Sequence, residues 1–422
     1  MNPSSAADVT DQTPPAATVP SSALHEIFRA AEAKERQTTT PVLKLHVGDP
    51  YFDPPQEAAD ALHDALRRGD TKYTGVEGIL ALREALAGKL AAENGLDAPV
   101  SRIFVTPGSA QGLTALLRAL AEPGAEILLP ELHWPVHLQQ SLLAGLRPVF
   151  YPLGPGFRPD PEAILAAAGP RTRLLLINSP ANPTGVVLDA RAQRVLLEGA
   201  RERGWQVVSD EAYEHYVYEG EHFSMASLER DLPQHQRIVH SVYSFSKSAA
   251  MTGYRLGYVA CANDRTAHAM SVVQEAGIIS PSTPIQYAGL AALGARDSVA
   301  ANAKLVAHNR NVLLPPLCAA GLLAELPAGG WYAVLDVSST GLDARTFADR
   351  LLETHSVAVV PAAGFALRPR LSAAGQVLSL DVPQWARSLV RIAFCGDPDL
   401  LPLGVEKIIH FARTCEVERA HG

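Results

Sequence analysis

The segment SFSKSAAMTGYRLGY (244–258) places Lys247 directly after an apolar run. A lysine at the end of a strand, inside a pocket, can form a Schiff base with an aldehyde cofactor. Ser244 lies three residues before this lysine and Arg255 eight residues after it. A hydroxyl and a guanidinium close together would bind a phosphate dianion. An exposed lysine with a structural arginine is the alternative, and this segment alone does not separate the two.

A second segment, VVSDEAY (207–213), ends an apolar run with a carboxylate. A carboxylate that closes a buried strand is costly unless it is paired. Asp210 could pair with the protonated nitrogen of a pyridine ring. Tyr213 would lie on the same side if a helical turn begins there. An N-cap aspartate followed by a core tyrosine is the common alternative.

Two loops that follow other apolar runs, NSPANPTG (178–185) and PGSAQG (107–112), could contact the same ligand. Asn182 can donate its amide to a phenolate oxygen, although an Asn-Pro pair is more usually only a turn. The backbone N–H groups of Ser109 and Ala110, at the start of a helix, would bind phosphate. This loop matches neither GxGxxG nor GxxxxGK, so nucleotide binding is not supported.

The segment PELHWPVH (130–137) adds an aromatic ring. Trp134 could stack on a flat heteroaromatic ring, although a buried tryptophan is more often only part of the core. His133 and His137 are expected at the surface or behind the site. No cluster of His, Asp and Glu has metal-ligand spacing, and no GxSxG nucleophile motif is present.

These residues must be positioned by strands that alternate with helices. Strands are expected at 103–106, 127–130, 174–178, 206–210, 238–244 and 256–261. Helices are expected at 22–36, 58–68, 79–94, 112–120, 138–144 and 190–203. This alternation predicts an α/β fold, with a mainly parallel sheet covered by helices on both faces. Ligands of such sheets gather at the carboxyl ends of the strands, where the residues above lie.

The pattern of expected helices and strands changes after about residue 300. Helices are expected at 301–313 and 347–354, and strands at 331–337, 357–361 and 389–394. This pattern predicts a smaller α+β unit packed on the first. At the other end, residues 1–20 are rich in Pro, Ser, Thr and Ala and are expected to form a disordered tail. No internal repeat is evident.

Composition limits the partners. The chain has 422 residues, with 36 basic and 44 acidic side chains and a formal charge of −8. This acidic balance argues against a nucleic-acid partner. Four cysteines form neither a disulfide framework nor a zinc motif. Neither a secretory signal nor a membrane segment is recognisable, so we expect a cytoplasmic protein without a membrane partner.

Together these motifs, in this order, resemble the fold-type-I pyridoxal 5'-phosphate (PLP) enzymes of the class I/II aminotransferase family. The likeness covers nearly the whole chain after residue 40. It is carried by KYTGVEGILALREALAGKL (72–90), TPGSAQGL, NSPANPTG, SDEAY, SFSKSAAMTGYRLGY and VRIAF (390–394). The resemblance implies a seven-stranded-type sheet in a large PLP-binding domain (57–300) and a smaller α+β domain (301–422). An N-terminal arm (21–56) would contribute to the smaller domain.

The resemblance also implies roles around the cofactor ring. Lys247 would hold PLP as an internal aldimine and act as general base and acid. Asp210 would keep the pyridine nitrogen protonated. Asn182 and Tyr213 would hydrogen-bond the phenolate oxygen, and Trp134 would stack on the ring.

Further roles concern the phosphate and the substrate. The phosphate would be bound by Ser109, Ala110, Ser244 and Arg255. Tyr73 matches a residue that reaches the phosphate from the neighbouring subunit, which implies a homodimer with shared sites. Arg391 matches the arginine that grips the substrate α-carboxylate. Asn182 and the backbone of Gly48 would approach the same carboxylate.

The implied activity is transfer of an amino group between an L-amino acid and a 2-oxo acid by ping-pong kinetics. A PLP lyase or synthase that uses the same residues for elimination, replacement, cyclisation or carbon–carbon bond formation is the alternative. A transcription regulator with an aminotransferase-like domain would need an added DNA-binding domain, and the acidic balance disfavours DNA.

Three departures from the family pattern concern substrate choice. Ala110 stands where many relatives carry a bulkier residue, His137 where a tyrosine is frequent, and Pro135 follows the stacking tryptophan. The stretch EAGIISPSTPIQ (275–286), which approaches the substrate side chain in the family, holds no basic residue. We therefore do not expect an aspartate or glutamate specialist.

Overall fold

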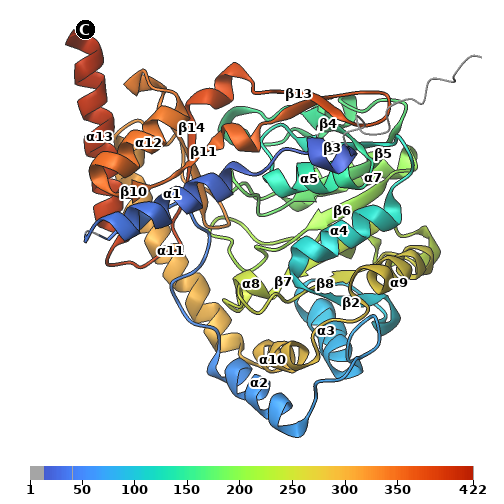
Figure 1. Ribbon diagram of the computed structural model, residues 1–422. Helices are drawn as coiled ribbons and strands as arrows, with labels where there is room; N and C mark the ends of the chain where they lie inside the picture. Colours follow the sequence, from blue (N-terminus) through green and yellow to red (C-terminus); the bar gives the residue numbers. More distant parts are fainter. Residues whose placement is uncertain (1–13, 40, 422) are drawn as a thin grey trace, which may run out of the picture.

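The computed structural model describes residues 14–39 and 41–421, and its centre is a seven-stranded sheet (Figure 1). In spatial order its strands are β2 (Ile103–Thr106), β8 (Gly257–Ala260), β7 (Val239–Ser244), β6 (Gln206–Asp210), β5 (Thr172–Asn178), β3 (Glu126–Pro130) and β4 (Arg147–Tyr151). Strand β8 runs antiparallel to both of its neighbours, and the other pairs are parallel. The predicted mainly parallel sheet is confirmed.

Helices cover both faces of this sheet because successive side chains of each strand point to opposite faces. In β5, Leu174 and Leu176 pack in the core cluster that includes α4 and α9, whereas Leu175 and Ile177 pack in the one that includes α6 and α7. The helices of this part are α2 (Gln56–Arg68), α3 (Leu80–Glu93), α4 (Gly108–Leu120), α5 (Pro135–Leu143), α6 (Pro161–Ala166), α7 (Ala190–Glu202), α8 (Phe245–Ser248), α9 (Asp264–Ile278) and α10 (Thr283–Gly294).

A second unit is built on the antiparallel sheet β11–β14–β9. The N-terminal arm joins this unit, because β1 pairs in parallel with β10. The elements are α1 (Ala23–Gln37), β1 (Leu43–Lys44), α11 (Arg296–Ala319), β9 (Tyr332–Asp336), α12 (Ala344–His355), β10 (Val357–Ala358), β11 (Val360–Pro361), β12 (Arg368–Leu371), β13 (Val377–Asp381), β14 (Leu389–Ala393) and α13 (Leu401–His421). The long helix α11 leads from the large sheet into this unit (Figure 1).

Local chemistry explains the element ends that the sequence indicated. The Ser22 side chain accepts a hydrogen bond from Leu24 N and caps α1. Helix α11 continues past the expected end at residue 313, through Pro315 and Pro316. Strand β4 was not expected, and its Pro148 is tolerated because β4 lies at the edge of the sheet.

The N-terminal residues are described only in part. The expected tail, residues 1–20, lies mostly outside the described residues. Within it, Pro15–Thr18 form a 3-10 turn, and the Thr18 hydroxyl accepts a hydrogen bond from Val377 N at 3.0 Å. Across residues 14–39 and 41–421, none of the helices combines the length and apolar character that a bilayer crossing needs.

Candidate active site

The carboxyl ends of three neighbouring strands meet at one cavity. Strand β5 ends at Asn178, β6 ends at Asp210, and β7 is followed directly by α8, which carries Lys247. The cavity has a volume of about 110 Å³. Its lining residues are Ser109, Trp134, Asn178, Asn182, Asp210, Ala212, Tyr213, Lys247 and Tyr332. Sequence reasoning placed six of these nine residues at one site.

Asp210 is buried at the floor of this cavity. One carboxylate oxygen, Oδ2, lies 2.9 Å from His137 Nε2, and the other accepts a hydrogen bond from Ala212 N at 3.2 Å. The Asn178 side chain donates to the backbone oxygen of Asp210 at 3.1 Å. The carboxylate is therefore held in a fixed orientation with a polar partner on one side.

Lys247 is fixed by a short helix and reaches across the cavity. Ser244 caps α8 by accepting a hydrogen bond from Ser246 N at 3.2 Å, and Tyr216 donates to the Lys247 carbonyl at 2.8 Å. The lysine Nζ donates to Gly48 O at 3.0 Å and lies 4.8 Å from the centre of the Trp331 ring. An amine on a positioned helix therefore faces the same cavity as the Asp210 carboxylate.

A cradle for an anion lies beside the cavity, at the start of α4. Gly108 has φ +77°, and a Cβ on this residue would overlap the guanidinium of Arg255. A Cβ on Gly257 would lie 2.5 Å from Ser109 N. Arg255 itself donates to Thr252 O at 2.9 Å and approaches the Ser246 hydroxyl at 3.4 Å. Two glycines thus bring free helix N–H groups and a guanidinium together, which is a favourable arrangement for phosphate.

Arg391 enters from the small unit, on β14. It is buried, donates to His46 O at 2.7 Å, and approaches Asn182 Oδ1 at 3.3 Å. Its guanidinium lies over the ring of Tyr332 at 4.2 Å. Burial, and then the charge of Arg391, lower the pKa of His46 to about 4, so this histidine adds no second charge at neutral pH. Arg391 Nε has no hydrogen-bond partner within the described part of the chain.

Two tyrosines close the side of the cavity towards the small unit. Tyr213 OH donates to Tyr332 OH at 3.3 Å. Burial, together with Tyr332, raises the pKa of Tyr213 well above its ordinary value, so its hydroxyl stays protonated and can donate. Gly48 touches Tyr332 so closely that a Cβ there would overlap the phenol oxygen.

The remaining expected residues take other positions. Ala110 accepts a hydrogen bond from Gln140 at its backbone oxygen. Tyr73 is 83% exposed and does not line the cavity of its own chain. His133 and His137 are both buried, so a surface position for them is wrong, whereas the alternative position behind the site holds for His137, which contacts Asp210. His133 faces Pro130 O instead of Asp210.

Some residues of the site were missed by the sequence reasoning. Asn178 ends β5 beside Asp210. It could have been predicted, because ligands of parallel sheets gather at the carboxyl ends of the strands. Ser246 lies two residues from the capping Ser244 and contacts Arg255. Tyr332 had no signal in the sequence, because its place depends on packing between the two units. No group of residues that could hold a metal ion occurs in 14–39 and 41–421.

Comparisons with known proteins agree with this geometry. The family described as "Aminotransferase class I and II" matches residues 40–406. A probable aspartate/prephenate aminotransferase of Thermus aquaticus is 38% identical over 82% of this chain and 90% of its own. An aspartate/prephenate aminotransferase of Thermus thermophilus is 39% identical over 78% of this chain and 86% of its own. A solved structure of a T. thermophilus aspartate aminotransferase mutant, complexed with tryptophan, aligns with a TM-score of 0.85 at 33% identity. The alignment covers 95% of this chain and 99% of that chain.

The chain therefore belongs to the class I and II aminotransferase family. It is a PLP-dependent aminotransferase, acting on amino acids and 2-oxo acids, with the fold of that family. The residues present fit PLP. The helix start at Gly108 lies against the guanidinium of Arg255, the buried Asp210 can face a pyridinium nitrogen, and the amine of Lys247 lines the same cavity as Asp210.

Proposed function

We propose that the cavity at the ends of β5, β6 and β7 is the transamination site and that Lys247 is its reactive amine. The observation that supports this proposal most directly is that Lys247 and Asp210 line one cavity. Asp210 ends β6, and Lys247 lies in α8, directly after the neighbouring strand β7. When bound, PLP supplies an electron-accepting ring that stabilises negative charge at the substrate Cα. Lys247 Nζ would hold the cofactor at its aldehyde, and the same amine would move the proton at the substrate Cα.

The other residues hold and orient the cofactor. Asp210 pairs with the ring nitrogen and is itself oriented by His137. Asn182 and Tyr213 donate to the phenolate oxygen, and Trp134 stacks on the ring. The phosphate is bound by Ser109, Ala110, Ser244, Arg255 and, in addition, Ser246. Ser244 Oγ accepts from Ser246 N, and its own proton stays available for donation.

Substrate recognition falls to residues at the junction of the two units. Arg391 binds the α-carboxylate, with Asn182 and the backbone of Gly48 beside it, as the buried guanidinium and its unpaired Nε support. Both half-reactions use this one cavity, which gives ping-pong kinetics. Residues 275–286 hold no basic side chain, so we propose that the enzyme is not an aspartate or glutamate specialist.

The assembly, domain division and location are also proposed. We propose a homodimer in which Tyr73 of each chain completes the site of its neighbour, supported by the 83% exposure of Tyr73. The division into an arm (21–56), a large domain (57–300) and a small domain (301–422) is supported by the separation of the seven-stranded sheet from the sheet β11–β14–β9. A cytoplasmic location is consistent with four cysteines that are all free.

The test uses single-turnover chemistry without an acceptor. An amino acid added to the holoenzyme alone should release one equivalent of 2-oxo acid per chain and then stop. Continued release of product would identify a lyase instead. In Lys247→Ala the burst should fall by at least about a thousandfold, and borohydride should no longer fix the cofactor to the chain. Serines flank Lys247 on both sides, at 246 and 248, so no adjacent amine can replace it, and retention of either signal would contradict the assignment.

A further inference from the structure

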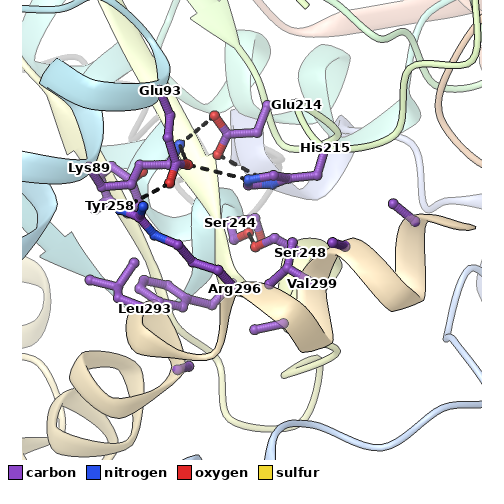
Figure 2. Close-up of a pocket in the computed structure, with 15 residues that line it drawn as sticks. Lys89, Glu93, Glu214, His215, Ser244, Ser248, Tyr258, Leu293, Arg296 and Val299 are labelled. Carbon is purple, nitrogen blue, oxygen red and sulfur yellow. Dashed lines mark hydrogen bonds and ion pairs between the residues drawn. The ribbon is translucent and has the colours of Figure 1, made fainter.

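A second cavity, of about 220 Å³ (Figure 2), lies next to the catalytic one but shares none of its lining residues. The two cavities are separated by α8. Ser244, Phe245 and Ser248 line the second cavity, whereas Lys247 of the same helix lines the catalytic one. The second cavity therefore borders the helix that carries the reactive amine, and the proposed phosphate ligand Ser244 is the one residue of the site described above among its lining residues.

One part of this cavity is apolar. Its walls come from the end of α10, with Ala292 and Leu293, and from the start of α11, with Val299 and Ala300. Phe245 adds an aromatic ring from α8. A cavity of about 150 Å³ can hold a benzene ring. The larger volume here has space for a ring or a branched chain together with a small polar head.

The other part is charged and balanced. Lys89 and Arg296 face Glu93 and Glu214 (Figure 2). Lys89 already has two close partners within the protein, because its Nζ lies 2.5 Å from a Glu214 carboxylate oxygen and donates to Asn94 Oδ1 at 2.8 Å. Two basic and two acidic side chains among the described lining residues sum to no net charge. A bound molecule is therefore expected to carry no net charge either.

Glu93 differs from Glu214 in its contacts. Lys89 lies 3.8 Å from Glu93, and His215 and Arg296 each lie 3.6 Å away. All three separations are longer than an ordinary hydrogen bond. The contact with His215 is the main cause that lowers the pKa of Glu93. The carboxylate is therefore ionised at neutral pH, and it can accept closer hydrogen bonds from a ligand.

An unsatisfied donor lines the same cavity. Tyr258 is 3% exposed, and its hydroxyl has no hydrogen-bond partner among the described residues. A buried hydroxyl without a partner costs free energy, which a ligand with an acceptor would recover. Burial, and then Glu214, raise the pKa of Tyr258 well above its ordinary value. The hydroxyl stays protonated and can donate to a carboxylate.

We propose that this cavity is a second, non-catalytic binding site for a zwitterionic amino acid with a large apolar side chain. The side chain occupies the walls formed by α10 and α11. The ammonium group donates to Glu93, and the carboxylate accepts from Tyr258 and Arg296. The ligand would touch both α8, which carries Lys247, and the first turns of α11, which leads into the small unit.

The test is equilibrium dialysis of labelled L-phenylalanine against holoenzyme that has been treated with borohydride, so that no transamination consumes the probe. About one equivalent should bind per chain. Ala300→Trp, at an exposed position on the cavity wall, should abolish this binding. Leu305→Trp is the matched control, because Leu305 is exposed on the same helix but does not line the cavity.

A second set of variants separates this site from the catalytic one. Arg391→Leu, or the milder Arg391→Lys, should leave the binding unchanged. Tyr258→Phe should weaken it by at least about tenfold. 3-Phenylpropionate and 2-phenylethylamine, which each lack one of the two charges, should bind at least about tenfold more weakly.

Three results would overturn the proposal. The first is that wild-type protein binds no phenylalanine. The second is that binding survives Ala300→Trp but is lost in Arg391→Leu. The third is that the analogues with a single charge bind as tightly as phenylalanine. The second result would place the ligand in the catalytic cavity. Thermal unfolding of each variant confirms that a loss of binding is not a loss of fold.

Discussion

At the scale of single residues, the orientation of Asp210 depends on His137. The carboxylate is buried and has two short contacts in the structure, one of which is the 2.9 Å contact with His137 Nε2. A buried carboxylate without its partner would turn or take up a proton. His137 therefore orients this carboxylate, and we expect it to act as a positioning residue through Asp210.

Replacing His137 tests this role. His137→Phe should lower kcat by about tenfold to a hundredfold and weaken cofactor binding, because Asp210 loses its orienting partner. KM for the amino acid should change much less. Steady-state kinetics and cofactor titration measure these effects. His133→Phe is the control, since His133 is equally buried but contacts Pro130 O. Equal losses in both variants would indicate damage to packing instead.

Glu214 determines part of the acid stability. Burial alone would raise its pKa, but Lys89 and His215, with a hydrogen bond from Asn94, more than offset burial and lower the pKa to about 2. A folded-state pKa below the unfolded value of 4.5 gives stability that is present above pH 4.5 and is lost as the pH falls towards 2. The contribution is at most about 3 kcal/mol.

Glu214→Gln should remove this pH dependence. The variant should be less stable than wild type at pH 7, because Lys89 loses its charged partner, and the difference should shrink as the pH falls from 4.5 towards the folded-state value of about 2. Urea unfolding at several pH values measures both. Glu202→Gln, at an exposed position, is the control. Parallel curves for wild type and Glu214→Gln over this range would contradict the prediction.

At the scale of elements, the start of α4 depends on a glycine. Gly108→Ala would introduce strain at φ +77° and overlap with Arg255. Gly124→Ala carries the same strain at φ +75° but has nothing within 4 Å of the added carbon. Both variants should lose about 1 kcal/mol of stability. Only Gly108→Ala should also weaken PLP binding by at least about tenfold, as measured by cofactor titration, and equal PLP affinities would contradict the phosphate site.

The strand ends could be predicted from the sequence, whereas contacts between the units could not. The apolar runs predicted both ends of β2 and of β6 correctly, and the end of β6 is the position of Asp210. The contact of Arg391 with His46 O joins positions 345 residues apart, and that of Lys247 with Gly48 O joins positions 199 apart. No periodicity encodes such distances, since they follow from how the small unit packs on the large sheet. Tyr332 was missed for the same reason.

At the scale of the whole molecule, the cavity draws on both units, and the proposed homodimer would add Tyr73 of the neighbouring chain. Tyr213 and Tyr216, in the loop after β6, share a core cluster with Trp331 and Tyr332 at the start of β9, which ties the two units together around Lys247. Tyr73 remains outside. Leu80, Val272 and Ile279 are also more than half exposed.

A mixed-subunit experiment tests the shared site. Tyr73→Ala and Lys247→Ala should each have little activity as pure proteins, and each should sediment at twice the chain mass of 45.0 kDa. After co-expression, the mixed dimer holds one site in which an intact Lys247 is completed by the intact Tyr73 of its neighbour. The other site carries both lesions. Activity should therefore return to about half that of wild type per mixed dimer. If Tyr73 acted within its own chain, every site would keep one lesion and no activity would return.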